Sequence, residues 1–129
     1  MTNAELLKNV WKTIYDPQIN VKEMVERFFH PDYEQCINGV TMKRNEYIQH
    51  VIEQRKNIKI GTIDYKHMLE KDNELFALYY PAGTNIHNLP FEAEVIAYFR
   101  FENEQISRIH GIVRLIKGDF ADLDMQKDN

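Results

Sequence analysis

Two neighbouring segments of the chain, 91–101 and 106–117, alternate between residues suited to a core and residues suited to a surface. In the first segment every odd position is apolar, whereas the even positions include Glu94 and Arg100. Successive side chains of a strand point to opposite faces of its sheet. The pattern therefore predicts two strands of a half-buried sheet whose odd positions face the core.

The shared face also predicts how these two strands pair. Residues that lie directly opposite each other share a face, so their numbers sum to an even value. A loop centred on Glu104 satisfies this condition, because it pairs Phe99 with Ile109 and Glu94 with Arg114. We therefore expect a turn of three or five residues with a bulge.

The rest of the chain divides into helices followed by strands. Capping residues and helical spacing predict a first helix that starts at Thr2 and stops near Pro17. A second helix is expected from Asn20 to Pro31, and a third over roughly 43–56. Runs rich in Ile, Tyr, Phe and Val predict the strands 33–38, 58–70, 75–81, 91–101 and 106–117.

This order of elements predicts an α+β fold. Three N-terminal helices are expected to pack on one face of a curved, four- to five-stranded antiparallel sheet. Residues 1–117 are expected to form a single domain, and residues 118–129 an acidic C-terminal tail.

Small residues on the predicted core face predict an internal pocket between the sheet and the helices. They are Ala93, Ala97 and Gly111, and they leave space that larger side chains would fill. The alternative is that aromatic residues of the helices, such as Trp11 and Phe28, occupy that space.

Composition narrows the class of protein. Hydrophobic residues make up 43% of the chain and the formal net charge is −4, which favours a globular domain without nucleic acid as its main partner. The single cysteine favours a reducing compartment, and no leader pattern or apolar run of ~20 residues is visible. We therefore expect a cytoplasmic protein without membrane contact. The scattered histidines and the absence of phosphate-loop or dinucleotide motifs predict no metal and no cofactor.

Two stretches, Phe28 to His50 and Arg108 to Asp119, resemble the SnoaL-like group of the nuclear-transport-factor-2-like superfamily. That group has the pattern Tyr-x-Gln-His, then a glycine, then an aromatic residue three positions before a histidine. The residues that match the pattern are Tyr33, Gln35, Gly39, Tyr47 and His50. Cys36 stands where these relatives usually have the histidine that follows the glutamine.

The resemblance implies a cone-shaped α+β barrel with a pocket for a small, mostly apolar ligand. It also implies a homodimer that forms through the sheet. The outer face of the last two strands suits such an interface, because it carries apolar side chains among charged ones. These apolar residues are Ile96, Tyr98, Ile112 and Ile116.

The predicted site combines the residues of the resemblance with the predicted core face. His50 is the candidate general base, and Cys36 is the candidate nucleophile or proton acceptor. The candidates for ligand binding are Tyr15, Tyr33, Gln35 and Tyr47, with Ala97, Gly111 and Val113 on the opposite wall. Structural roles stay open as well, since a lone cysteine is often a small buried hydrophobe. His50 also lies about 130° from the centre of the apolar stripe of its helix.

Three functions fit these observations. The first is binding of an apolar small molecule. The second is a cofactor-free isomerase, dehydratase or cyclase that acts on a small carbonyl compound by acid–base chemistry, and the third is a structural or accessory subunit that forms dimers. Acid–base catalysis needs two convergent titratable groups, and the predicted core face of the last strands offers none. Binding is therefore favoured, and whether any reaction is catalysed stays open.

Overall fold

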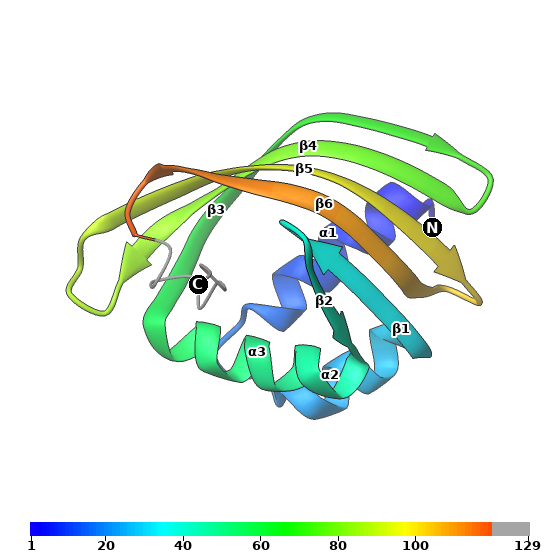
Figure 1. The fold of residues 1–129 in the computed structure, drawn as a ribbon, viewed down its shortest axis with the longest axis horizontal. Helices are drawn as coiled ribbons and strands as arrows, with labels where there is room; N and C mark the ends of the chain where they lie inside the picture. Colours follow the sequence, from blue (N-terminus) through cyan, green and yellow to red (C-terminus); the bar gives the residue numbers. More distant parts are fainter. Residues whose placement is uncertain (120–129) are drawn as a thin grey trace.

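The structure, a computed structural model, describes residues 1–119 of the chain. Figure 1 shows three helices on the concave side of one strongly bent sheet. The elements in chain order are α1 (Asn3–Ile14), α2 (Val21–Phe28), β1 (Phe29–Ile37), β2 (Val40–Lys43), α3 (Arg44–Asn57), β3 (Ile58–Lys71), β4 (Glu74–Asn85), β5 (Pro90–Glu102) and β6 (Gln105–Lys117). The α+β class with three N-terminal helices is thus confirmed. The predicted acidic tail lies mostly outside the described residues.

The sheet differs from the predicted one in two ways. It has six strands in the order β2-β1-β6-β5-β4-β3, where four or five were expected. It is also mixed, because β1 and β6 run parallel while the other neighbouring strands are antiparallel. A parallel pair needs a long connection, and here residues 38–104 separate the two strands.

The strand that the sequence analysis missed is β2. It pairs with β1 across a two-residue turn at Asn38 and Gly39, both of which have positive φ (52° and 82°). An Asn-Gly pair between strands favours this kind of hairpin, because both residues tolerate the left-handed region. β1 also starts four residues earlier than predicted, at Phe29.

The helix starts follow the predicted caps. The Thr2 hydroxyl accepts a hydrogen bond from the Glu5 backbone N–H at 3.1 Å, and the Glu5 carboxylate accepts one from the Thr2 N–H at 2.7 Å. The Asn20 side chain accepts from the Glu23 N–H at 3.0 Å. These contacts satisfy N–H groups that have no partner inside the helix. The buried stripe of α1 has the helical spacing expected of this segment and is formed by Leu6, Leu7, Val10, Trp11 and Ile14.

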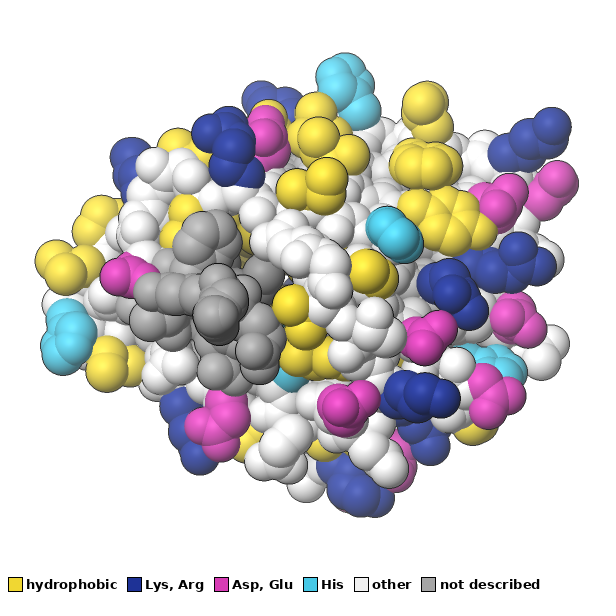
Figure 2. Space-filling view, in the orientation of Figure 1, with side chains coloured by type: hydrophobic (Ala, Val, Ile, Leu, Met, Phe, Trp, Pro, Cys, Tyr) yellow, Lys and Arg dark blue, Asp and Glu magenta, His cyan; other side chains and the backbone are white. Residues whose placement is uncertain are grey.

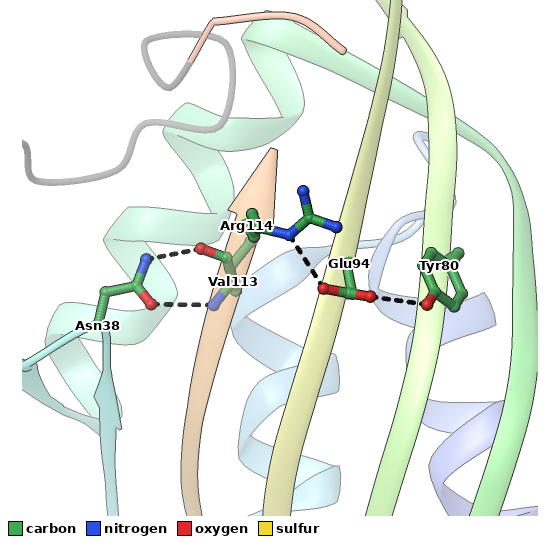
Figure 3. Close-up of polar contacts among 5 residues, drawn as sticks. All are labelled: Asn38, Tyr80, Glu94, Val113 and Arg114. Carbon is green, nitrogen blue, oxygen red and sulfur yellow. Dashed lines mark hydrogen bonds and ion pairs between the residues drawn. The ribbon is translucent and has the colours of Figure 1, made fainter. Parts of the chain in front are cut away.

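The register of β5 and β6 is confirmed. Phe99 lies opposite Ile109, and Glu94 lies opposite Arg114. The Arg114 Nε is 3.1 Å from the Glu94 carboxylate, which also accepts a hydrogen bond of 2.7 Å from the Tyr80 hydroxyl of β4 (Figure 3). Three strands are therefore linked on their outer face.

The turn that produces this register is shorter than predicted. It has two residues, Asn103 and Glu104, both with positive φ (52° and 62°), and the strands pair from Glu102 and Gln105 onward. The predicted bulge is present, because Ser107 is an extra residue on β6 without a partner on β5. Along most of the ladder beyond this bulge, the numbers of paired residues sum to an even value, as the prediction required. The loop length was therefore wrong and the bulge was right.

Close backbone approach bends the sheet where β3 meets β4. The ladder shifts beside Gly61, and a Cβ atom on Gly83 would lie 1.9 Å from the Lys59 carbonyl oxygen. Only glycine fits at residue 83. This bend carries the first half of β3 toward the helices, where it closes one side of the fold (Figure 1).

None of the helices in residues 1–119 is long and apolar enough to cross a membrane.

Candidate functional site

A cavity of about 130 Å³ lies between the helices and the concave face of the sheet. Side chains from α1, α3 and all six strands line it. The apolar lining residues are Ile37, Val40, Met42, Ile58, Ile60, Ile63, Pro81, Phe91, Ala93, Val95, Ala97, Ile109 and Val113. The lining residues that carry a polar atom are Trp11, Tyr15, Gln35, Tyr47, His50, Gln54 and Tyr79.

Most of the predicted site residues lie in this lining, and their roles in binding stay predictions. Those in the lining are Tyr15, Gln35, Tyr47, His50, Ala97 and Val113. The structure does not place Tyr33, Cys36 and Gly111 there.

Cys36 does not lie in the cavity wall, contrary to the prediction. Gln35 and Ile37 both line the cavity, and side chains alternate along a strand. Cys36 therefore points to the other face of β1. The predicted pair of Gln35 and Cys36 in one wall was inconsistent with this alternation.

Gly111 also makes no space in the cavity. It lies opposite Ala97, and a Cβ atom on it would be 2.7 Å from the Ala97 Cβ and 2.7 Å from the Ile96 carbonyl oxygen. The glycine therefore permits β5 and β6 to approach closely. The small residues that leave room in the wall are Ala93 and Ala97.

Tyr33 is buried just behind the lining and orients Gln35. Its hydroxyl donates a 2.7 Å hydrogen bond to the Gln35 carbonyl oxygen. The Gln35 amide nitrogen then points toward the Met42 sulfur at 3.9 Å, which is a weak acceptor. Gln35 is thus held with its N–H groups as the available polar atoms.

Tyr15 and Gln54 form a second polar pair in the lining. The hydroxyl of Tyr15, the C-cap residue of α1, donates to the Gln54 side-chain oxygen of α3 at 2.8 Å. The sequence analysis did not identify Gln54. Its spacing from Tyr47 and Val51, seven and three positions, puts it on the buried stripe of α3. A glutamine on an apolar stripe was the signal that could have revealed it.

Buried tyrosines give the cavity neutral hydroxyl groups. Burial raises the pKa of Tyr15, Tyr47 and Tyr79, so all three stay protonated at neutral pH. The Trp11 indole N–H acts in the opposite direction on the pKa of Tyr79, which shows that the two groups are neighbours. Their geometry falls short of a hydrogen bond, and the buried Trp11 Nε1 has no acceptor within the described part of the chain.

His50 lies in the lining despite its unfavourable position on the helical wheel. It is half-buried on α3, and its ring centre is 6.3 Å from that of Tyr47. Of the described lining residues, His50 is the one that carries an imidazole, which can act as a general acid or base. Within residues 1–119, no three His, Cys, Asp or Glu residues cluster as metal ligands would.

The lining residues of β3 depend on a bulge. Ile60 and Ile63 both reach the cavity although their numbers differ by three, because the ladder shifts between Ile60 and Thr62. A regular strand would put them on opposite faces.

The comparisons with known proteins agree on the fold. No protein-family model matches the sequence. An uncharacterized protein of Schizosaccharomyces pombe is 21% identical over 123 residues, which are 95% of this chain and 94% of that protein.

Solved structures match at lower identity and with similar coverage. A candidate SnoaL-like polyketide cyclase from Jannaschia sp. has a TM-score of 0.70 at 6% identity, over 86% of this chain and 84% of that chain. An NTF2-like protein of unknown function from Exiguobacterium sp. has a TM-score of 0.68 at 12% identity, over 88% of this chain and 98% of that chain. Such identities show the fold and not the activity. The chain therefore has the nuclear-transport-factor-2-like fold that its sequence resembles.

Proposed function

We propose that this protein binds a small, mostly apolar molecule in the cavity between the helices and the sheet. The observation that carries the proposal is the lining, in which apolar side chains from every strand surround a few buried polar groups. An engineered apolar cavity of about 150 Å³ holds benzene. The cavity of about 130 Å³ therefore suits a molecule of roughly six to eight non-hydrogen atoms.

Binding is favoured over acid–base catalysis because of the titratable groups at the cavity. Catalysis of that kind uses two groups whose pKa values are separated around neutral pH. The buried tyrosines stay protonated, and no Asp or Glu is among the described residues that line the cavity. An isomerase, dehydratase or cyclase acting on a small carbonyl compound is the alternative, supported by the likeness to a candidate polyketide cyclase.

Thermal unfolding with small apolar compounds tests the proposal. A ligand at about 100 times its Kd stabilises the folded state by about 2.7 kcal/mol, which raises the Tm. Ala97→Leu extends a side chain into the cavity and should abolish the rise. Ile96→Leu, on the opposite face of the same strand, is the matched control and should retain it. Equal stabilisation of both variants by the compounds would place binding outside the cavity.

We also propose that two copies of the chain pair through the outer face of the sheet. Phe76, Ile96 and Ile112 are 57%, 53% and 64% exposed, and the last two lie directly opposite each other. Hydrophobic side chains gather over β4, β5 and β6 in the upper right of Figure 2, with charged groups of both signs beside them. A two-fold contact would bury the apolar residues and pair opposite charges, such as Glu94 and Arg114 of different copies.

Light scattering at micromolar concentration tests the dimer. The expected mass is twice the 15.4 kDa of one chain. Ile96→Asp should reduce it to that of one chain, whereas Ile86→Asp, exposed in the loop between β4 and β5, serves as a charge-matched control. A wild-type protein with the mass of one chain would remove the proposal, and with it the function as a dimer-forming accessory subunit.

A further inference from the structure

We propose that Gln35, Tyr47 and Tyr79 form a cluster of hydrogen-bond donors that selects ligands with a neutral acceptor oxygen. This inference rests on the proposed binding function and names the ligand class of the same cavity. The three residues come from β1, α3 and β4, and all three line the cavity. Their side chains are 6%, 4% and 7% exposed, so most of each side chain is shielded from bulk water.

The donors of this cluster have no strong acceptor in the described part of the chain. Neither the Tyr47 nor the Tyr79 hydroxyl makes a hydrogen bond to another residue in 1–119, and the Gln35 amide nitrogen has the Met42 sulfur at 3.9 Å. The Tyr47 and Tyr79 hydroxyls are not among the fully buried polar atoms that lack a partner, so both retain accessible surface at the cavity that they line. Thioether sulfur is a weak acceptor for the Gln35 amide. An acceptor atom on a bound molecule would satisfy them.

The side-chain carbonyl oxygens of the lining are already used. The Gln35 oxygen accepts from the Tyr33 hydroxyl at 2.7 Å, and the Gln54 oxygen accepts from the Tyr15 hydroxyl at 2.8 Å. The Trp11 indole N–H is a further buried donor that has no acceptor within residues 1–119. Donors therefore outnumber available acceptors.

The charge of the lining disfavours a cationic ligand. No Asp or Glu occurs among the described lining residues, so a buried ammonium group would lack an opposite charge. A pure hydrocarbon would fit the apolar wall but would leave the donors unpaired. An apolar molecule with one neutral oxygen acceptor satisfies both parts of the lining.

Three probes of matched shape test this selection. Cyclohexanone carries the acceptor oxygen, methylenecyclohexane replaces that oxygen by a CH₂ group, and cyclohexylamine is protonated at neutral pH. Trp11 is the single tryptophan of the chain and lines the cavity, so its fluorescence reports binding of each probe. We expect cyclohexanone to bind about three- to tenfold more tightly than methylenecyclohexane, which is the range for one or two neutral hydrogen bonds. We expect cyclohexylamine to bind most weakly.

Two variants identify the donors. Tyr47→Phe and Tyr79→Phe each remove one hydroxyl and retain the ring, so each should reduce the preference for cyclohexanone by about two- to threefold and leave methylenecyclohexane binding unchanged. Tyr65→Phe is the matched control, because Tyr65 lies on β3 outside the lining and packs beside Tyr79 with ring centres 5.5 Å apart. The two substitutions are independent, so either one alone tests the cluster if the other does not fold.

The outcomes separate this inference from the proposed function. Equal affinity for cyclohexanone and methylenecyclohexane, in the wild type and in both variants, would overturn the donor cluster and leave apolar binding intact. Tightest binding of cyclohexylamine would overturn it as well. Failure of all three probes to change the Trp11 fluorescence or the Tm would count against the binding function itself.

Discussion

Asn38 joins the turn between β1 and β2 to a strand of the cavity wall, and its loss should destabilise the protein measurably. Its side-chain nitrogen donates to the Val113 carbonyl oxygen at 3.0 Å, and its side-chain oxygen accepts from the Val113 N–H at 2.9 Å (Figure 3). The Asn38 backbone N–H also donates to the Gly111 carbonyl at 3.1 Å. The amide thus continues the pairing of β1 with β6 beyond the end of β1.

The size of the effect follows from two separable contributions. Each neutral hydrogen bond contributes about 0.5–1.5 kcal/mol, and the exposure of Asn38 favours the lower half of that range. Asn38→Gly removes both side-chain bonds and keeps the left-handed backbone (φ 52°), so we expect a loss of about 1–2 kcal/mol. Asn38→Ala should cost about 1 kcal/mol more, because alanine tolerates the left-handed region less well than asparagine or glycine.

Urea unfolding followed by Trp11 fluorescence measures these losses, because the single tryptophan is buried in α1. The midpoint should fall and the slope m should stay constant. Asn103→Gly is the control, since Asn103 has the same φ of 52° but makes no side-chain hydrogen bond in the described structure. We expect that control to change stability by less than about 0.5 kcal/mol. An Asn38→Gly protein as stable as the wild type would show that the amide contributes nothing.

Two further predictions concern the sheet. Gly83→Ala should lower the free energy of unfolding by about 3 kcal/mol or more, because the new Cβ would lie 1.9 Å from the Lys59 carbonyl oxygen. Gly61→Ala meets its nearest atom at 3.6 Å, so its stability in urea unfolding should stay within about 1 kcal/mol of the wild type. Equal losses of stability in the two variants would contradict the argument. The hydrogen bond from Tyr80, and then the one from Arg114, holds the pKa of Glu94 below its usual 4.5. A carboxyl group whose pKa is lower in the folded state stabilises the protein above pH 4.5, and this stabilisation is lost as the pH falls below that value. The difference in stability between the wild type and Glu94→Gln should therefore shrink between about pH 5 and pH 2. A difference that does not depend on pH would refute the pairing.

Alternation along the strands was enough to predict the core face and the strand register. Val95, Ala97 and Ile109 were assigned to the inner face, and the structure buries all three. Applied to β1, the same rule would have corrected the site, because Gln35 and Cys36 are adjacent and face opposite sides. That error came from following the resemblance at Cys36 and not from missing information.

Other features depend on geometry that no local pattern expresses. The close approach of Gly111 to Ala97 and the bulge that turns Ile60 and Ile63 to the same side are set by how the strands bend around the helices. The hairpin at Asn38 and Gly39 was locally encoded, but β2 has only four residues, which is too short for an alternation to be recognised.

The hydrogen-bonding groups that the cavity offers to a ligand depend on which polar residues already bond to each other. The Tyr33 hydroxyl donates to the side-chain oxygen of Gln35, and the Tyr15 hydroxyl donates to that of Gln54. Both glutamines line the cavity. If either tyrosine were phenylalanine, its glutamine would present an oxygen to the cavity and the lining would accept donors as well. The preference for an acceptor therefore depends on residues behind and beside the cavity as much as on those that would touch a ligand. Tyr33→Phe should accordingly weaken the preference for cyclohexanone although Tyr33 lies outside the lining, and an unchanged preference would mean that Gln35 plays no part in it.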